Sequence, residues 1–334
     1  MNTMKFTEHE EKLLATIFAL SQRVDKVTFN VLENAFDGDS EENEDCKSAI
    51  ESLITKGVLF DEDGDYVVSD DVKPIAAKIL NQQREKGFSE CLVKNESSEV
   101  YGVFCERLYG KNLSQFNMTP MYQLDHLLKI LRIDSGSHIL DLGCGIGRIT
   151  EYVCETTNAA VTGLDFAAGA IQRARGRNKG NRKLHYIVGD MNNLQLEANS
   201  FDVIIAIDTV YFVEDLKTLI GKLKEIVKNG GQMGIFYDEM VKSDEDKNNL
   251  EADHTRLAKA LNDHALTYVC FDYTEDEKKF WKKELDLAKK MKAEFEAAGE
   301  LETYKARVEE SQRILKCITE DRLSRHLYVV NVDK

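Results

Sequence analysis

Three glycines at alternate positions give this sequence its clearest chemical signal. They lie in "HILDLGCGIGRIT", His138 to Thr150, after an apolar run that ends around Asp141. Glycine lets a backbone turn approach a bound molecule closely, and a turn after a buried parallel strand is where nucleotide cofactors bind. The dinucleotide pattern requires a third glycine after two intervening residues, and Arg148 stands there. The spacing D-x-G-x-G-x-G therefore indicates a nucleotide cofactor but departs from the dinucleotide pattern.

Acidic residues end the next apolar runs along the chain. "VTGLD" ends with Asp165, eighteen residues after Gly147, "KLHYIVGD" ends with Asp190, and "FDVIIAID" ends with Asp208. A carboxylate at the position of Asp165 can accept hydrogen bonds from both hydroxyls of a ribose, and on its own it would suit NAD equally well. Because the carboxyl ends of parallel strands meet at one edge of a sheet, we expect these acids to lie near the glycines.

These four motifs, in this order, resemble those of class I S-adenosylmethionine-dependent methyltransferases. The resemblance is close over residues 100–240, weakens beyond them, and does not extend to residues 1–90. It implies that Asp190 receives the adenine amino group, that the backbone amide of Met191 meets the ring, and that "FDVIIAID" lies beneath the methionine portion. Asp141 is left with two roles, orienting backbone amides or touching the cofactor, and Cys144 is interpreted as a small spacer because no base neighbours it. The predicted cofactor-binding residues are Asp141, Gly143, Cys144, Gly145, Gly147, Asp165, Phe166, Asp190, Met191, Asp208 and Tyr109.

In-line attack on the activated methyl requires a positioned nucleophile and a group that accepts or relays its proton. We predict Asp208, Tyr211 and Asp238 as the catalytic residues. With Tyr237 and Glu239 they would form a lining that suits an amine, although Asp238 and Glu239 can equally be read as solvated loop charges. No metal is needed, and no histidine-carboxylate cluster at ligand spacing occurs in the sequence, so no metal site is predicted.

Strand-like runs alternate with helix-length segments from His138 onward, which predicts a parallel sheet with helices on both faces. We expect an α/β, Rossmann-like, doubly wound, seven-stranded and mostly parallel sheet over residues 136–334, with a charged helical insert at 274–323 opened by a capping box of Thr274 and Glu277. The insert would pack one apolar face on the sheet edge. A connector at 91–135 contains a helix with Thr119 as N-cap and Pro120 as first residue, and its aromatic side chains would close with the insert over the site. Those side chains are Tyr101, Phe104, Tyr109, Phe116 and Tyr122.

Residues 1–90 predict three helices and a hairpin, a pattern typical of a winged helix, with a capping box of Thr7 and Glu10 at the start. Their net charge is -10, out of -15 for the whole chain of 334 residues. A domain of that charge repels phosphate, so dimerisation, giving a homodimer, or a structural role is favoured over DNA binding.

The remaining function classes are separated by short motifs. Nucleic-acid methyltransferases of the adenine and exocyclic-cytosine type resemble one another in two prolines after the fourth strand, whereas Asp208-Thr209-Val210-Tyr211 stands here, and Pro74 and Pro120 are the only prolines. A small-molecule substrate is therefore favoured, with an NAD-dependent oxidoreductase and a ligand-sensing regulator as alternatives. Seven cysteines without a CxxC pair, and no long apolar segment or leader, predict a cytoplasmic protein that does not enter a membrane.

Overall fold

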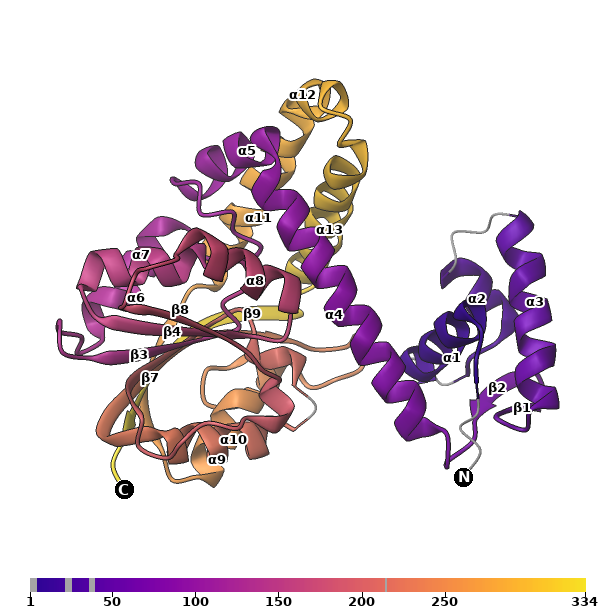
Figure 1. The fold of residues 1–334 in the computed structure, drawn as a ribbon, viewed down its shortest axis with the longest axis horizontal. Coiled ribbons are helices and arrows are strands. Elements are labelled where there is room, and N and C mark those ends of the chain that lie inside the picture. The colour runs from indigo at the N-terminus through magenta and orange to yellow at the C-terminus, as the bar shows by residue number, and fades with distance from the viewer. Residues whose placement is uncertain (1–4, 22–25, 36–39, 214) are drawn as a thin grey trace. The chain divides into compact units, whose positions relative to one another are not determined.

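The computed structural model describes residues 5–21, 26–35, 40–213 and 215–334 (Figure 1). The chain divides into two compact units, residues 1–88 and residues 89–334. Within the described residues no helix is both long enough and apolar enough to cross a bilayer.

The first unit contains α1 (Glu8–Ser21), α2 (Phe29–Ala35), α3 (Ser40–Thr55) and the antiparallel hairpin of β1 (Leu59–Glu62) and β2 (Asp65–Val68). It also contains the start of α4 (Lys73–Ser97), which continues into the second unit. The predicted capping box is present, because the Thr7 amide donates to Glu10 Oε2 at 2.7 Å and the Glu10 amide donates to Thr7 Oγ1 at 3.3 Å. Apolar side chains from the helices and the hairpin form one core.

The second unit is built on a seven-stranded sheet of order β5-β4-β3-β6-β7-β9-β8. Its strands are β3 (His138–Leu142), β4 (Ala160–Asp165), β5 (Leu184–Val188), β6 (Phe201–Ile207), β7 (Val227–Met240), β8 (Thr267–Asp272) and β9 (Leu323–Val332). The pairs from β5 to β7 are parallel, and β9 runs antiparallel to both of its neighbours. The predicted Rossmann-like sheet is confirmed.

Helices cover both faces of this sheet. α6 (Met121–Ile130), α7 (Arg148–Thr157) and α8 (Ala168–Arg177) lie on one face, and α9 (Leu216–Ile226) and α10 (Arg256–Asp263) lie on the other (Figure 1). Each face has its own buried apolar cluster, and the central strands contribute alternate side chains to the two. The sheet is therefore buried on both sides at its centre and holds its strand ends rigidly.

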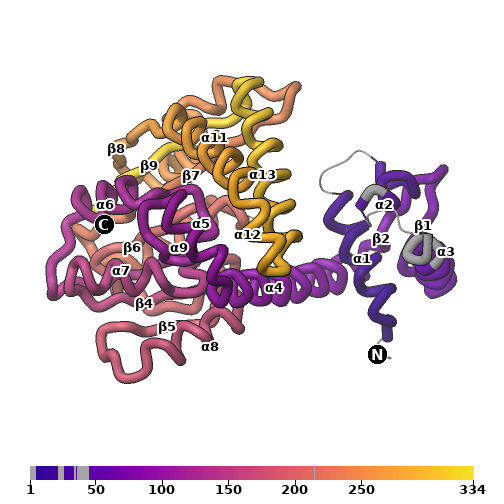
Figure 2. Tube along the Cα trace, turned by 90° about the horizontal axis from the view of Figure 1, so that it is seen from above, coloured from indigo at the N-terminus to yellow at the C-terminus, as the bar shows by residue number. Residues whose placement is uncertain are grey.

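A separate helical layer is formed by the connector helix α5 (Glu99–Tyr109) and the insert helices α11 (Thr274–Lys290), α12 (Lys292–Ala297) and α13 (Leu301–Thr319) (Figure 2). We call this layer the cap. Its core brings Tyr101, Phe104 and Tyr109 of the connector against Phe280 and Trp281 of the insert. The prediction that the insert packs on the sheet edge was wrong, because α11 packs chiefly on α13 and α5 and touches the sheet at β9, an inner strand.

Two predicted helix starts were also wrong, and one reason explains both. Pro120, rather than Thr119, is the N-cap of α6, and Tyr273, rather than Thr274, is the N-cap of α11 with no side-chain cap bond. The Thr119 hydroxyl is bonded elsewhere, and the Thr274 hydroxyl accepts from the Arg325 amide at 3.1 Å. Tertiary hydrogen bonds to buried groups have replaced the local caps.

Candidate active site

The glycine turn joins β3 to α7 at the carboxyl edge of the sheet. Gly143, Gly145 and Gly147 all adopt positive φ, at 76°, 52° and 77°, a region where a side chain is strained. A Cβ on Gly147 would lie 2.7 Å from Tyr186 Cε1, and one on Gly143 would collide with the Thr209 hydroxyl. Conformation and close packing therefore both require glycine at the two ends of the turn.

Asp141 lies beneath this turn at the end of β3. Its side chain is buried, and Oδ2 accepts a hydrogen bond from the Thr150 hydroxyl at 2.6 Å. Burial raises the pKa of Asp141 to about 7; the Thr150 bond lowers it only in part, and nearby Asp165 raises it further. The carboxyl thus links the strand end to the first turn of α7.

Asp165 ends β4 next to the glycine turn. Oδ2 accepts from the Gly145 amide at 2.8 Å and Oδ1 accepts from the Ala167 amide at 2.9 Å. Burial raises the pKa of this carboxyl, although its backbone hydrogen bonds lower it. A carboxylate has about four acceptor positions, so each oxygen retains acceptor capacity beyond these two bonds.

The other predicted cofactor residues lie in different surroundings. Asp190 is exposed and caps the short 3-10 helix η1 (Met191–Asn193), accepting from the Asn192 amide at 2.8 Å. Phe166 is partly buried in the loop after β4. Tyr109 is buried in the cap, where its hydroxyl donates to the Asn117 carbonyl at 2.6 Å and its ring lies 5.4 Å from that of Phe280.

Thr209 connects three of these loops and was not singled out from the sequence. Its side chain faces Gly143 of the glycine turn, and its hydroxyl lies 3.7 Å from the sulfur of Met191 after β5. Its position directly after Asp208 in the strand-end motif was the only sequence signal. Packing by Thr209 therefore fixes the spacing between the loops after β3, β5 and β6.

A buried arginine, Arg325 on β9, organises the ends of β6 and β7. Nη1 donates to Asp208 Oδ1 and to Asp238 Oδ1, both at 2.6 Å, and Nη2 donates to Asp208 Oδ2 at 3.0 Å and to Thr119 Oγ1 at 2.8 Å. Asp208 Oδ2 also accepts from the Met118 amide at 2.9 Å and from the Thr119 hydroxyl at 3.0 Å. Asp208 has φ of 53°, a strained conformation that this set of contacts holds in place. The connector, the sheet and the strand that follows the insert thus meet at one guanidinium group.

A third acid from the cap faces the same arginine. Glu277 Oε2 lies 3.3 Å from Arg325 Nε without hydrogen-bond alignment, while Glu277 Oε1 accepts from the Trp281 indole. Burial, reinforced by Asp238, holds the pKa of Glu277 well above its usual range despite the nearby arginine. Burial also raises the pKa of Asp238 to about 6; Arg325 opposes that rise and Asp208 adds to it.

Tyr211, Tyr237 and Glu239 were also predicted to line the site, and Glu239 is bound by a different arginine. Tyr211 is half-buried, its ring lies 6.3 Å from that of Tyr237, and burial beside Asp208 holds the pKa of its phenol well above the usual range. Glu239 is buried, and Arg256 binds it through its amide at 2.6 Å and its Nε at 2.7 Å. The reading of residue 239 as a solvated loop charge was therefore wrong.

Sequence reasoning missed Arg325, Glu277 as a site residue, and Thr119 as more than a helix cap. Arg325 lies 117 positions beyond Asp208 in the chain and reaches it only because β9 inserts between β7 and β8. The one available signal was that a charged residue, Arg325, directly precedes the apolar run "HLYVVNV".

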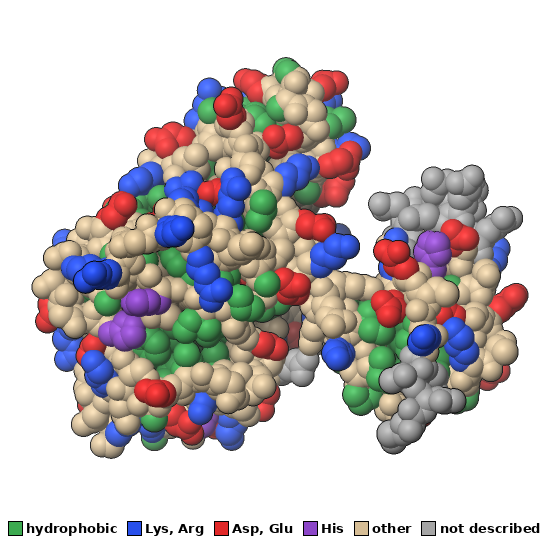
Figure 3. Space-filling view, viewed as in Figure 1, with side chains coloured by type: hydrophobic (Ala, Val, Ile, Leu, Met, Phe, Trp, Pro, Cys, Tyr) green, Lys and Arg blue, Asp and Glu red, His purple; other side chains and the backbone are tan. Residues whose placement is uncertain are grey.

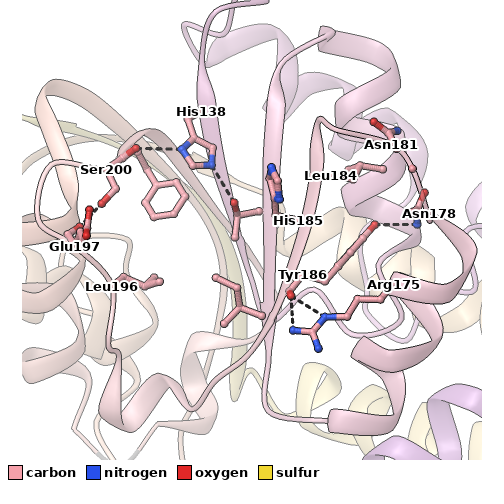
Figure 4. Close-up of a pocket in the computed structure, with 14 residues that line it drawn as sticks. His138, Arg175, Asn178, Asn181, Leu184, His185, Tyr186, Leu196, Glu197 and Ser200 are labelled. Atoms are coloured by element: carbon pink, nitrogen blue, oxygen red, sulfur yellow. Dashed lines mark hydrogen bonds between the residues drawn. The ribbon is translucent and has the colours of Figure 1, made fainter.

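A pocket of about 650 Å³ lies elsewhere on the unit (Figure 4). His138, His185 and Ser200 line it at the amino-terminal end of the parallel strands, and the imidazole of residue 138 bonds the Thr162 hydroxyl and the Ser200 carbonyl. Ligands of open α/β sheets bind at the carboxyl ends of the strands, so this pocket is not the candidate active site.

Comparison with known proteins identifies the central part of the second unit. A sequence profile described as a methyltransferase domain matches residues 140–235, which run from β3 into β7. Residues 140–235 of this chain therefore correspond to a methyltransferase domain. The resemblance carried by the glycine turn and the strand ends is thereby confirmed.

This chain aligns with only part of the length of its curated relatives. A sterol 24-C-methyltransferase from Gibberella zeae is 28% identical over 163 residues, which is 48% of this chain and 42% of that protein. A phosphoethanolamine N-methyltransferase from Triticum aestivum is 28% identical over 156 residues, which is 45% of this chain and 30% of that one. The chain thus aligns with less than half of each.

Among solved structures, a Haemonchus contortus phosphoethanolamine N-methyltransferase in complex with phosphomonomethylethanolamine and S-adenosylhomocysteine gives a TM-score of 0.62 at 18% identity, covering 74% of this chain and 60% of that one. A cyclopropane synthase from Mycobacterium tuberculosis gives a TM-score of 0.56 at 12% identity, covering 71% of this chain and 95% of that one. At these identities the likeness concerns the fold.

Proposed function

We propose that the chain binds S-adenosylmethionine at the glycine turn and transfers its methyl group to a small molecule by in-line displacement. The observation that carries the proposal is the turn of three positive-φ glycines beside Asp165 within a methyltransferase domain. The solved relative with S-adenosylhomocysteine supports the choice of cofactor.

The residues present fit this cofactor. The glycine turn would bring backbone close to the ligand, and Asp165 would accept from the ribose hydroxyls. Asp190 and Met191, which follow β5, would meet the adenine. When bound, the sulfonium supplies an activated methyl group, so the protein itself must orient the acceptor and take up its proton. Cys144 packs in the turn, where burial holds the pKa of its thiol well above the usual range and keeps it protonated.

For the acceptor we propose an amine, with Asp238 as the group that takes its proton. Asp238 Oδ1 is fixed by Arg325, and a pKa near 6 makes the carboxylate a base matched to neutral pH. Asp208 would orient the acceptor, and Tyr211, protonated at neutral pH, would donate a hydrogen bond to it. The N-methylating relatives favour this choice, whereas the sterol relative represents carbon acceptors.

Titration calorimetry with S-adenosylhomocysteine and, separately, with NAD tests the cofactor. We expect micromolar or tighter binding of S-adenosylhomocysteine and none of NAD; the reverse pattern would favour an oxidoreductase. Labelled S-adenosylmethionine with a panel of primary and secondary amines between pH 5 and 9 tests the acceptor. The rate of a methylated amine should rise with pH around 6 in the wild type, and Asp238→Asn should lose that rise. Turnover of carbon acceptors alone would leave the cofactor proposal standing and reject the amine.

For residues 1–88 we propose a winged-helix-like domain with a structural or dimerising role, supported by the three helices, the hairpin and the acidic charge. The matching measurement is a gel shift with duplex DNA at physiological salt, in which no complex is expected. Micromolar binding would favour the regulator instead.

A further inference from the structure

One face of the second half of α4 follows the loops at the carboxyl ends of β3 and β4. Ser89, Leu92 and Glu96 are spaced three and four residues apart, so they share a face of the helix. Ser89 Oγ accepts from the Gly169 amide in the first turn of α8 at 3.1 Å. A Cβ on Gly145 would lie 3.6 Å from Leu92 Cδ1, so the leucine packs directly on the glycine turn.

Glu96 ends this face and binds three arginines from two helices. Oε1 accepts from Arg148 Nη2 at 2.8 Å and from Arg177 Nη1 at 2.9 Å, while Oε2 accepts from Arg173 Nε at 2.7 Å. The Glu96 side chain is only 5% exposed, and its pKa lies below the usual range because the arginines outweigh the effect of burial. A single carboxylate thus bridges α7 and α8.

Two of these arginines connect directly to the glycine turn. Arg148 follows Gly147 in the chain, and Arg177 Nη2 donates to the carbonyl of Ile146 within the turn at 2.6 Å. Glu151 also binds Arg177, at 2.7 Å from Nε. Arg173 differs from the other two, because it is half exposed and its bonds run to Glu96 and the Ser97 hydroxyl.

We infer that Glu96 is a positioning residue for the cofactor, which sets the glycine turn through Arg177 and Arg148 without touching the ligand. The inference rests on the proposed function, since it concerns the same turn. The chemistry follows from charge: without the carboxylate, three guanidinium groups lie near one another, and Glu151 remains as an acidic partner of Arg148 and Arg177 alone. Arg177 would then turn away, and the Ile146 carbonyl would lose its donor.

The main test is Glu96→Gln, which keeps the size of the side chain and removes its charge. We expect the Kd for S-adenosylhomocysteine to rise at least tenfold and the KM for S-adenosylmethionine to rise in parallel, while kcat at saturating cofactor stays within twofold. A purely structural role would lower the amount of folded protein without this split between KM and kcat. Glu96→Asp retains the charge and should recover most of the affinity.

Two matched variants locate the effect. Arg173→Gln removes one ion pair of Glu96 that does not reach the turn, and Glu90→Gln removes an exposed carboxylate on the same helix. Both should bind S-adenosylhomocysteine as the wild type does. If Arg173→Gln weakens binding as much as Glu96→Gln does, the turn-specific role is wrong.

The outcomes separate this inference from the proposed function. Failure of the wild type to bind S-adenosylhomocysteine would overturn the proposed function. Wild-type binding together with unchanged affinity in folded Glu96→Gln would overturn the inference alone. Should Glu96→Gln not fold, Arg177→Lys, which keeps the charge but loses the donor geometry, gives the same test: a weakened Kd supports the inference and an unchanged one rejects it.

Discussion

Two pairs of aspartates lie at the same edge of the sheet and are stabilised in opposite ways. Asp141 and Asp165, at the ends of β3 and β4, bind a hydroxyl and backbone amides, and among the described residues no cation is a hydrogen-bond partner of either. Asp208 and Asp238, at the ends of β6 and β7, share the buried guanidinium of Arg325. Neutral donors hold the first pair, whereas one arginine of the protein itself partly balances the charge of the second pair.

The difference shows which groups stabilise the buried carboxylates in each half of the site. Burial raises the pKa of a carboxyl that only neutral donors bind, as at Asp141, while a buried ion pair makes stability depend strongly on one partner. The proposed cofactor side therefore depends on local backbone geometry, and the proposed acceptor side depends on a contact between distant segments.

Loss of the arginine gives the largest expected effect. Arg325→Met leaves Asp208 and Asp238 buried without their cation, which should lower the free energy of unfolding by about 3–5 kcal/mol. Urea unfolding measures it, with Arg313→Gln, a change at an exposed arginine of α13, as control. A loss below about 1 kcal/mol would mean that the second pair is not held by charge.

For the first pair we predict that the free energy of unfolding depends on pH through Asp141. Its folded pKa of about 7 exceeds the ordinary value, so the folded state holds the proton more tightly and stability is full at low pH and lost as pH rises toward 7. The loss amounts to about 4 kcal/mol at most, on about 1.4 kcal/mol for each pKa unit. Asp141→Asn should flatten the dependence of unfolding free energy on pH between 4 and 8. An unchanged slope would assign the effect to another group.

Asp165 is predicted to act on affinity. Asp165→Ala removes the proposed acceptor for the ribose hydroxyls and should weaken binding of S-adenosylhomocysteine by about 1.5–3 kcal/mol for each charge-assisted bond lost. Calorimetry on this variant and on the exposed control Asp253→Asn provides the comparison. Equal affinity in both would reject the ribose assignment.

A change at Thr119 should have the smallest effect, and it tests how the second pair of aspartates is held. Thr119→Val keeps the shape of the side chain and removes a hydroxyl that donates to Asp208 and accepts from Arg325. Since those two partners still bind each other, we expect a loss of about 1 kcal/mol in urea unfolding. A loss as large as that of Arg325→Met would show that the connector, rather than the ion pair, holds this corner.

The same contrast explains what could be predicted from sequence. The sheet, the glycine turn and Asp165 follow from signals within some thirty residues, because strand, turn and helix are neighbours in the chain and each glycine conformation is local. The partners of Asp208 come from the connector and from β9, and no periodicity relates Thr119 or Arg325 to it. The two helix starts were misplaced for this reason, since side chains suited to local caps were used in tertiary contacts.

The continuity of α4 has a practical consequence for dividing the molecule. The boundary at residues 88 and 89 falls inside this helix, so a chain trimmed to begin at Ser89 would start with about two and a half turns whose first amides have lost their carbonyl partners. Those exposed amides would include the ones at Ser89 and Leu92, the residues that pack on the α8 start and the glycine turn. A fragment intended to retain cofactor binding should therefore begin near Ser69, whose carbonyl accepts from the Lys73 amide at the natural start of the helix.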